Sequence, residues 1–180
     1  MTHDYRRFAK TSLATLVLFL APAPSSPVAA PGRSDEKPPA AMPGSVVVVP
    51  FVYLGNVDDV LTKSFVDRLG SPKDGWKMVD AEAMKPHLGK KVQLRSDAQM
   101  PVLLKAAKAA GAEAMILGIG ANYKFMDAPG VRLRVRMISV ATGTELHSGM
   151  AEETAWSVQG AKEEAAESAA KKLVKQFRAK

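Results

Sequence analysis

Three arginines occupy alternate positions in the stretch VRLRVRMISV, residues 131–140, where Arg132, Arg134 and Arg136 are separated by apolar residues. Neighbouring residues of a β-strand point to opposite faces, so this spacing would place three guanidinium groups in one row. Guanidinium groups bind carboxylates and phosphates through paired hydrogen bonds. The chemistry that this row could perform is the capture of an anionic partner.

The strand that returns after the ATGT turn could neutralise part of this charge. Strict alternation assigns Leu146, Ser148 and Met150 to the core side of that strand. The same alternation places two acidic residues and a histidine on the arginine side, namely Glu145, His147 and Glu153. Opposite charges on paired strands contribute about 0.2–1 kcal/mol each, so the pattern is also typical of a solvated sheet face.

A contact surface for an acidic protein or an anionic glycan is the functional alternative to that solvated face, with His147 as a candidate residue beside the arginine row. Nucleic acid is disfavoured as a partner because the row lacks the interleaved aromatic side chains on which bases stack. The formal net charge of +7 is also spread along the chain, whereas nucleic-acid modules concentrate basic residues on one face.

Residue patterns typical of catalysis are missing from the sequence. No cysteine is present, which excludes thiol catalysis, disulfides and thiolate metal sites. The three histidines, His3, His87 and His147, are far apart and show no metal-ligand spacing. The stretch GIGANY has Gly118 and Gly120 but lacks the third glycine and the helix of a dinucleotide site. The sequence therefore predicts no enzyme activity, no cofactor and no metal. A hydrolase whose catalytic pair assembles from distant segments stays open as a third alternative, behind the two binding functions described below.

Two aromatic residues, Phe51 and Tyr53, follow the first predicted strand in the segment PFVYLGN. They could pack over the core. Alternatively, Tyr53 could contribute to an interface, where tyrosine is enriched. Tyr53 is therefore a further candidate partner-binding residue.

The first thirty residues have the pattern of an export signal. Arg6, Arg7 and Lys10 precede an apolar run over residues 13–21. That run is shorter than the ~20 residues that span a bilayer and matches the hydrophobic region of a secretory signal. Residues 1–30 are predicted to be a signal peptide, or an N-terminal anchor if Pro31 prevents cleavage after the VAA motif. Residues 31–44 are a Pro/Ala-rich linker, and the predicted location is the periplasm.

Residues 45–180 are predicted to form one domain. A β-branched run from residue 45 predicts a buried strand that ends or bulges at Pro50, which cannot donate to a ladder. Apolar residues four positions apart predict a helix that is capped by Asn56 and ends at Gly70. A short strand over 75–80 and helices over 81–88 and 101–111 follow. Three antiparallel strands over 113–125, 131–140 and 145–153 lead to a last helix over 157–177.

The predicted element order is β-α-β-α-α-β-β-β-α. This order indicates an α/β or α+β protein with a single mixed β-sheet and packed helices. One face of the last helix is predicted to approach the sheet closely, because alanines dominate it: Ala165, Ala169, Leu173 and Phe177.

Four segments carry a family resemblance through their order and spacing. They are VVVVPF as an opening strand, LTKSFVDRL followed by GWKMVD, AAKAAGAEAMILGIG as a helix leading into a strand, and VRMISVATGTELHSG as a hairpin. Together they resemble the superfamily that includes the curli-secretion protein CsgG, the N-terminal domain of TolB and the penicillin-binding-protein activator LpoB. The resemblance covers residues 45–177 and implies an anticodon-binding-domain-like fold. It also implies a cell-envelope protein that acts through protein contacts and not as an enzyme.

One departure from this superfamily concerns the membrane anchor. CsgG and LpoB are lipoproteins anchored through a cysteine, and this chain has none. The resemblance therefore implies a free or N-terminally tethered periplasmic module that assists assembly, secretion or regulation of an envelope complex, with oligomerisation left open. The alternative is an envelope glycan- or lipopolysaccharide-binding protein that uses the arginine row.

Overall fold

The computed structural model describes residues 43–70, 76–90 and 92–178. The predicted export segment and all but the end of the linker lie outside the described residues. The elements are, in chain order, β1 (Ser45–Val48), β2 (Val52–Tyr53), β3 (Asn56–Val57), α1 (Asp59–Leu69), β4 (Lys77–Val79), the 3₁₀ helix η2 (Ala81–His87), α2 (Met100–Ala109), β5 (Ala114–Phe125), β6 (Ala128–Ser139), β7 (Glu145–Thr154) and α3 (Val158–Arg178).

The described strands form one mixed sheet with the long strand β5 at its centre. One edge of β5 pairs antiparallel with β6, which pairs antiparallel with β7. The other edge pairs in parallel first with β1 and then with β2. β4 and β3 extend the sheet beyond β1 and β2 respectively. The predicted fold class, one mixed sheet with packed helices, is confirmed.

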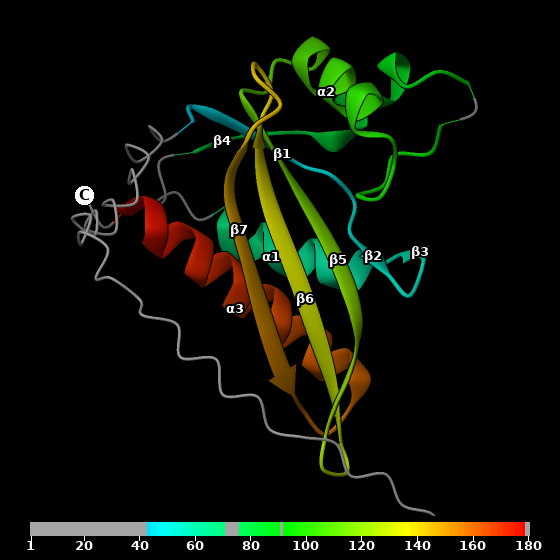
Figure 1. The fold of residues 1–180 in the computed structure, drawn as a ribbon, viewed down its shortest axis with the longest axis vertical. Helices are drawn as coiled ribbons and strands as arrows, with labels where there is room; N and C mark the ends of the chain where they lie inside the picture. The colour runs from blue at the N-terminus through cyan, green and yellow to red at the C-terminus, as the bar shows by residue number, and fades with distance from the viewer. Residues whose placement is uncertain (1–42, 71–75, 91, 179–180) are drawn as a thin grey trace, which may run out of the picture. The chain divides into compact units, whose positions relative to one another are not determined.

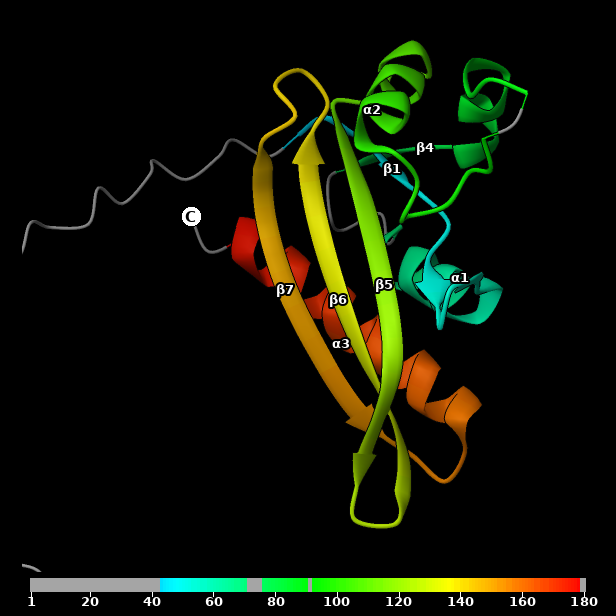
Figure 2. The same ribbon diagram turned by 45° about the vertical axis from the view of Figure 1, so that its right-hand side comes forward.

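Helices cover the two faces of the sheet unequally. Helices α1 and α3 pack on one face and enclose the larger core, which includes Phe65, Leu133 and Leu173. Helix α2 and η2 pack on the other face over a second core that includes Leu103 and Ile138. Figures 1 and 2 show that α2 lies at one end of the long strands β5, β6 and β7, which continue far beyond it. Part of this second face is therefore left without a helix among the described elements.

The last helix approaches the sheet closely, as its alanine-rich face predicts. Ala165 and Leu173 have no exposed surface and Ala169 is 6% exposed. Phe177 is partly buried and meets Trp76 edge-on, with 5.7 Å between ring centroids. Small side chains on this helix allow its backbone to lie near β6 and β7.

The break between β1 and β2 occurs at Pro50, as predicted, and two hydroxyl groups replace the lost ladder partners. The Phe51 N–H donates to Thr62 Oγ1 at 2.8 Å. On β5, the Gly118 N–H donates to Ser96 Oγ at 3.0 Å, and Ser96 Oγ also lies 2.9 Å from the Pro50 carbonyl oxygen. Ser96 is 5% exposed, so this hydroxyl satisfies backbone groups that water does not reach.

Gly118 marks a close approach in β5. A Cβ atom built on Gly118 would lie 2.5 Å from the ring of Phe51. Any side chain at this position would displace the ring, which packs on Phe65 with 5.0 Å between ring centroids. The glycine is therefore a packing requirement of the core.

Two local predictions are corrected by the structure. The N-cap of α1 is Asp58, whose side chain accepts a hydrogen bond from the Leu61 N–H at 2.9 Å. Asn56 instead pairs with Tyr53 in a small hairpin that the sequence pattern did not indicate. The sequence DAPG predicts a turn at residues 127–130, whereas the turn between β5 and β6 lies at residues 126–127, because pairing of the two strands continues to Phe125 and Ala128.

Candidate docking surface

The three arginines of β6 lie on the face of the sheet that α2 covers only at one end. Arg132 and Arg134 are exposed and Arg136 is half-buried. Ile138 continues the same row beneath α2 and has no exposed surface. The predicted row of guanidinium groups therefore exists, and it starts where helical cover ends.

The neighbouring strands supply a second and a third row on this open face. Residues directly opposite each other on paired strands share a face. From β5, Leu117, Ile119 and Ala121 lie opposite Arg136, Arg134 and Arg132. From β7, Ser148, Met150 and Glu152 lie opposite the same three arginines. We call the uncovered part of this face the open face; it comprises alternate residues from Ile119 to Tyr123 on β5, from Arg132 to Arg136 on β6 and from Ser148 to Glu152 on β7.

The two outer arginines are neutralised within the chain. Arg132 Nε lies 2.5 Å from Glu152 Oε1, and its guanidinium carbon lies 5.4 Å from the centroid of the Tyr123 ring. Arg136 Nε lies 2.5 Å from Glu145 Oε2. The predicted partial neutralisation by acidic residues of the returning strand is therefore present, although Glu152 takes the place of Glu153.

The central arginine has different surroundings. Arg134 forms no ion pair with any residue in the described ranges. Its cross-strand neighbours are Ile119 and Met150, both 50% exposed. The middle of the open face thus combines an unneutralised guanidinium group with two large apolar side chains that no described residue covers.

The predicted orientation of the β7 side chains was wrong after Leu146, the second residue of the strand. Ile138 pairs with Glu145 while Met137 pairs with His147, so the register shifts and Leu146 is the extra residue of a β-bulge. A bulge reverses the alternation of all residues that follow it. Glu145 is on the arginine side as predicted, whereas Ser148 and Met150 are on the arginine side and not on the core side.

His147 is displaced from the arginine row by the same bulge. It lies opposite Met137, on the side of the sheet that carries α3, next to Gln176 of that helix. Burial lowers the pKa of His147 below 6.5, partly opposed by the charge of Glu145 and by Gln176. The structure does not bring His147 together with the three arginines.

Tyr53 packs in the core, which is one of the two interpretations of its position. Its side chain is 8% exposed, and its hydroxyl bonds to Asn122 Oδ1. The ammonium group of Lys162 lies 4.1 Å from the centroid of its ring. The ring is therefore occupied by contacts within the chain and lies apart from the open face.

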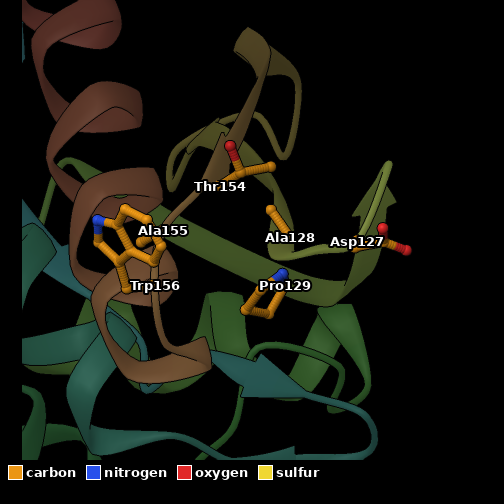
Figure 3. Close-up of a pocket in the computed structure, with 6 residues that line it drawn as sticks. All are labelled: Asp127, Ala128, Pro129, Thr154, Ala155 and Trp156. Carbon is orange, nitrogen blue, oxygen red and sulfur yellow. The ribbon is translucent and has the colours of Figure 1, made fainter.

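A second surface feature lies at the far end of the β5–β6 hairpin and was not predicted from the sequence. An open hollow of about 550 Å³ is lined by Asp127, Ala128, Pro129, Thr154, Ala155 and Trp156. Figure 3 shows the start of β6 facing the segment that leaves β7. Trp156 is fully exposed and Met126, at the turn, is 84% exposed. The available signal was Trp156, one of two tryptophans in the sequence, which stands between the last predicted strand and the last predicted helix; an exposed tryptophan at such a place is unusual, because tryptophan is usually much buried in monomeric proteins.

No arrangement typical of catalysis emerges from the described residues. No group of three or more potential metal-binding side chains comes together in the ranges 43–70, 76–90 and 92–178. A second hollow, beside η2, has a mixed lining that includes Lys85, Leu88 and Lys90, and Lys85 there pairs with Glu82 at 2.7 Å. Among the described helices, none combines the length and apolar character needed to span a bilayer.

Comparison with known proteins identifies the fold but not a family. No protein-family model matches the sequence, and no curated protein matches it. A solved structure of a PelC dodecamer from Paraburkholderia phytofirmans has 15% sequence identity and a TM-score of 0.50, covering 73% of this chain and 88% of that chain. The chain therefore shares the fold of PelC.

Two further solved structures resemble the chain with lower TM-scores. The C-terminal domain of LpoB from Escherichia coli has 15% identity and a TM-score of 0.45, over 61% of this chain and 82% of that chain. The lipoprotein GNA1162 from Neisseria meningitidis has 21% identity and a TM-score of 0.45, over 64% and 83%. The relation to CsgG and the anticodon-binding-domain-like designation stay predictions.

Proposed function

We propose that this protein is a non-enzymatic interaction module of the cell envelope. It is exported to the periplasm, where it docks on a partner protein and assists the assembly, secretion or regulation of an envelope complex. The observation that carries the proposal is the open face, where Ile119 and Met150 are each half exposed beside Arg134. Methionine and arginine are enriched at protein–protein interfaces relative to the rest of the surface.

Two further observations support the envelope and the assembly parts of the proposal. The first thirty residues have the pattern of an export signal, and the domain resembles envelope proteins in four segments. The protein of the same fold, PelC, is a dodecamer, which supports a role in assemblies. Self-association of this chain remains part of the proposal and is measured by light scattering of the purified protein.

Site-specific photo-crosslinking in cells of the source organism tests the proposal. A photoreactive residue is placed at Ala121 or Ser148, which are exposed on the open face, and at Lys175, which is exposed on α3. We expect a discrete crosslinked protein from the two open-face positions and a weaker or absent product from Lys175. Absence of any crosslinked protein from every surface position would contradict an interaction function.

A second candidate function is binding of an anionic envelope glycan or lipopolysaccharide. The row of three guanidinium groups, two of them exposed, favours it. Replacing all three arginines by serine would abolish salt-sensitive binding to sacculi or lipopolysaccharide if this function holds. Unchanged binding, or no binding by the unaltered protein, would reject it.

A further inference from the structure

We infer that the open face receives a protein segment that inserts one carboxylate onto Arg134 and apolar side chains onto Ile119 and Met150. This inference rests on the proposed function, because it specifies the partner of the same surface. It names Arg134 as the residue that determines which partner segment is accepted.

Charge distribution along the arginine row singles out Arg134. Arg132 and Arg136 each have a carboxylate within 2.5 Å, from Glu152 and Glu145. An incoming carboxylate would have to displace these partners, whereas Arg134 offers its guanidinium group without displacement. The row therefore presents one available positive charge at its centre and two that are already neutralised.

The apolar neighbours explain how a single surface charge can contribute to affinity. An exposed ion pair contributes little in water. Ile119 and Met150 lie directly opposite Arg134 on the two adjacent strands. When a partner covers these side chains it removes water around the guanidinium group, which strengthens the attraction between opposite charges. Near-neutral contacts that exclude water commonly surround an arginine of this kind at interfaces.

The same arrangement favours a protein over a polysaccharide as the occupant. A polysaccharide presents mostly hydroxyl groups, and its small C–H faces would give Ile119 and Met150 less apolar contact than aliphatic or aromatic side chains do. A protein segment can present an aspartate or glutamate with aliphatic or aromatic residues on both sides of it. Such a segment matches the open face in charge and in polarity.

The test uses the full chain and a photoreactive residue at Ser148, which leaves Ile119, Arg134 and Met150 unaltered. The crosslinked partner segment is sequenced by mass spectrometry. We expect an acidic residue flanked by apolar residues close to the crosslink. We also expect Arg134→Gln to lower the crosslink yield about tenfold, as loss of a hydrogen bond to a charged group implies.

Arg132→Gln is the matched control, because it removes the same group from a residue that Glu152 already neutralises. Its expected crosslink yield is within about twofold of the unaltered protein, since an exposed internal pair contributes little. Circular dichroism and thermal unfolding establish that both variants are folded. Arg134→Glu should abolish the crosslink, and changing the captured carboxylate to lysine in the partner should restore it.

The outcomes separate this inference from the proposed function. Crosslinks that form only from other surfaces would overturn the inference and leave the interaction function intact. A captured segment without a carboxylate, or equal losses in Arg134→Gln and Arg132→Gln, would also overturn it. Absence of crosslinks from all positions would reject both.

Discussion

Lys162 of α3 and Asp58 at the start of α1 form an ion pair, with 2.5 Å between Nζ and Oδ2. The side chains are only 17% and 12% exposed. The other carboxylate oxygen of Asp58 accepts a hydrogen bond from the Leu61 N–H at 2.9 Å. One carboxylate therefore caps α1 and anchors α3, so that both helices are held on the face opposite the open face.

Replacing Lys162 by methionine should destabilise the protein by about 2–3 kcal/mol. The change leaves the Asp58 carboxylate largely buried without its partner, and breaking a fully buried pair costs about 3–5 kcal/mol. Denaturant unfolding measures the difference. Lys171→Met is the control, because Lys171 pairs with Glu167 where both side chains are about half exposed, and its effect should not exceed about 0.5 kcal/mol. Equal effects of the two changes would contradict this account of the helix anchor.

Gly118→Ala should destabilise the protein by about 1–3 kcal/mol, as overpacking of a core does. The added methyl group would lie 2.5 Å from the Phe51 ring, which has no exposed surface. Gly89→Ala is the matched control, because no atom lies within 4 Å of the position of its Cβ. A free energy of unfolding unchanged by Gly118→Ala would show that Phe51 moves without cost.

Ser96→Ala should lower the free energy of unfolding by about 1–3 kcal/mol, the cost of leaving a buried donor unsatisfied. The Gly118 N–H loses its acceptor, and the carbonyl of Pro50 loses a donor at 2.9 Å. Ser148→Ala removes an exposed hydroxyl and should be neutral. If both serine variants unfold at the same denaturant concentration as the unaltered protein, the hydroxyl does not support the break at Pro50.

Protonation of His147 should make the protein less stable as pH falls. Burial lowers the pKa of His147 below 6.5 in the folded state, against the smaller opposing effects of Glu145 and Gln176. The unfolded chain therefore binds the proton first, and the free energy of unfolding falls from about pH 6.5 down to the lowered pKa. His147→Gln should reduce this decline in unfolding measured at about pH 7.5 and 5.5. A decline that is the same in both proteins would assign it to other groups.

The open face shows where sequence reasoning succeeded and where it could not. The arginine row followed from alternation within one strand, a local property of the backbone. The β7 residues that lie opposite the arginines could not be predicted from alternation. One inserted residue, Leu146, reverses the side of the sheet on which every later residue of β7 lies. A bulge of this kind depends on pairing between strands, which no single-strand pattern records.

In the rest of the fold, too, local patterns were predicted and features that depend on contacts between elements were not. Buried strands, the proline break and the alanine face of α3 were predicted because each is a repeated local pattern. The cap of α1 was misplaced because Asn56 and Asp58 are both good caps, and the pairing of Asn56 with Tyr53 decides between them. The uneven helical cover of the sheet face that carries the arginines depends on where α2 packs along the strands, which is a tertiary property.

Accessibility of a single cysteine in intact cells tests most directly whether the open face is the docking surface. The sequence contains no cysteine, so Ser148→Cys and Lys175→Cys each introduce one unique thiol for labelling with a small maleimide. We expect both thiols to label fully in the purified protein, whereas in cells of the source organism the thiol of Ser148→Cys is protected and that of Lys175→Cys is not. Equal labelling of the two thiols in cells would contradict it.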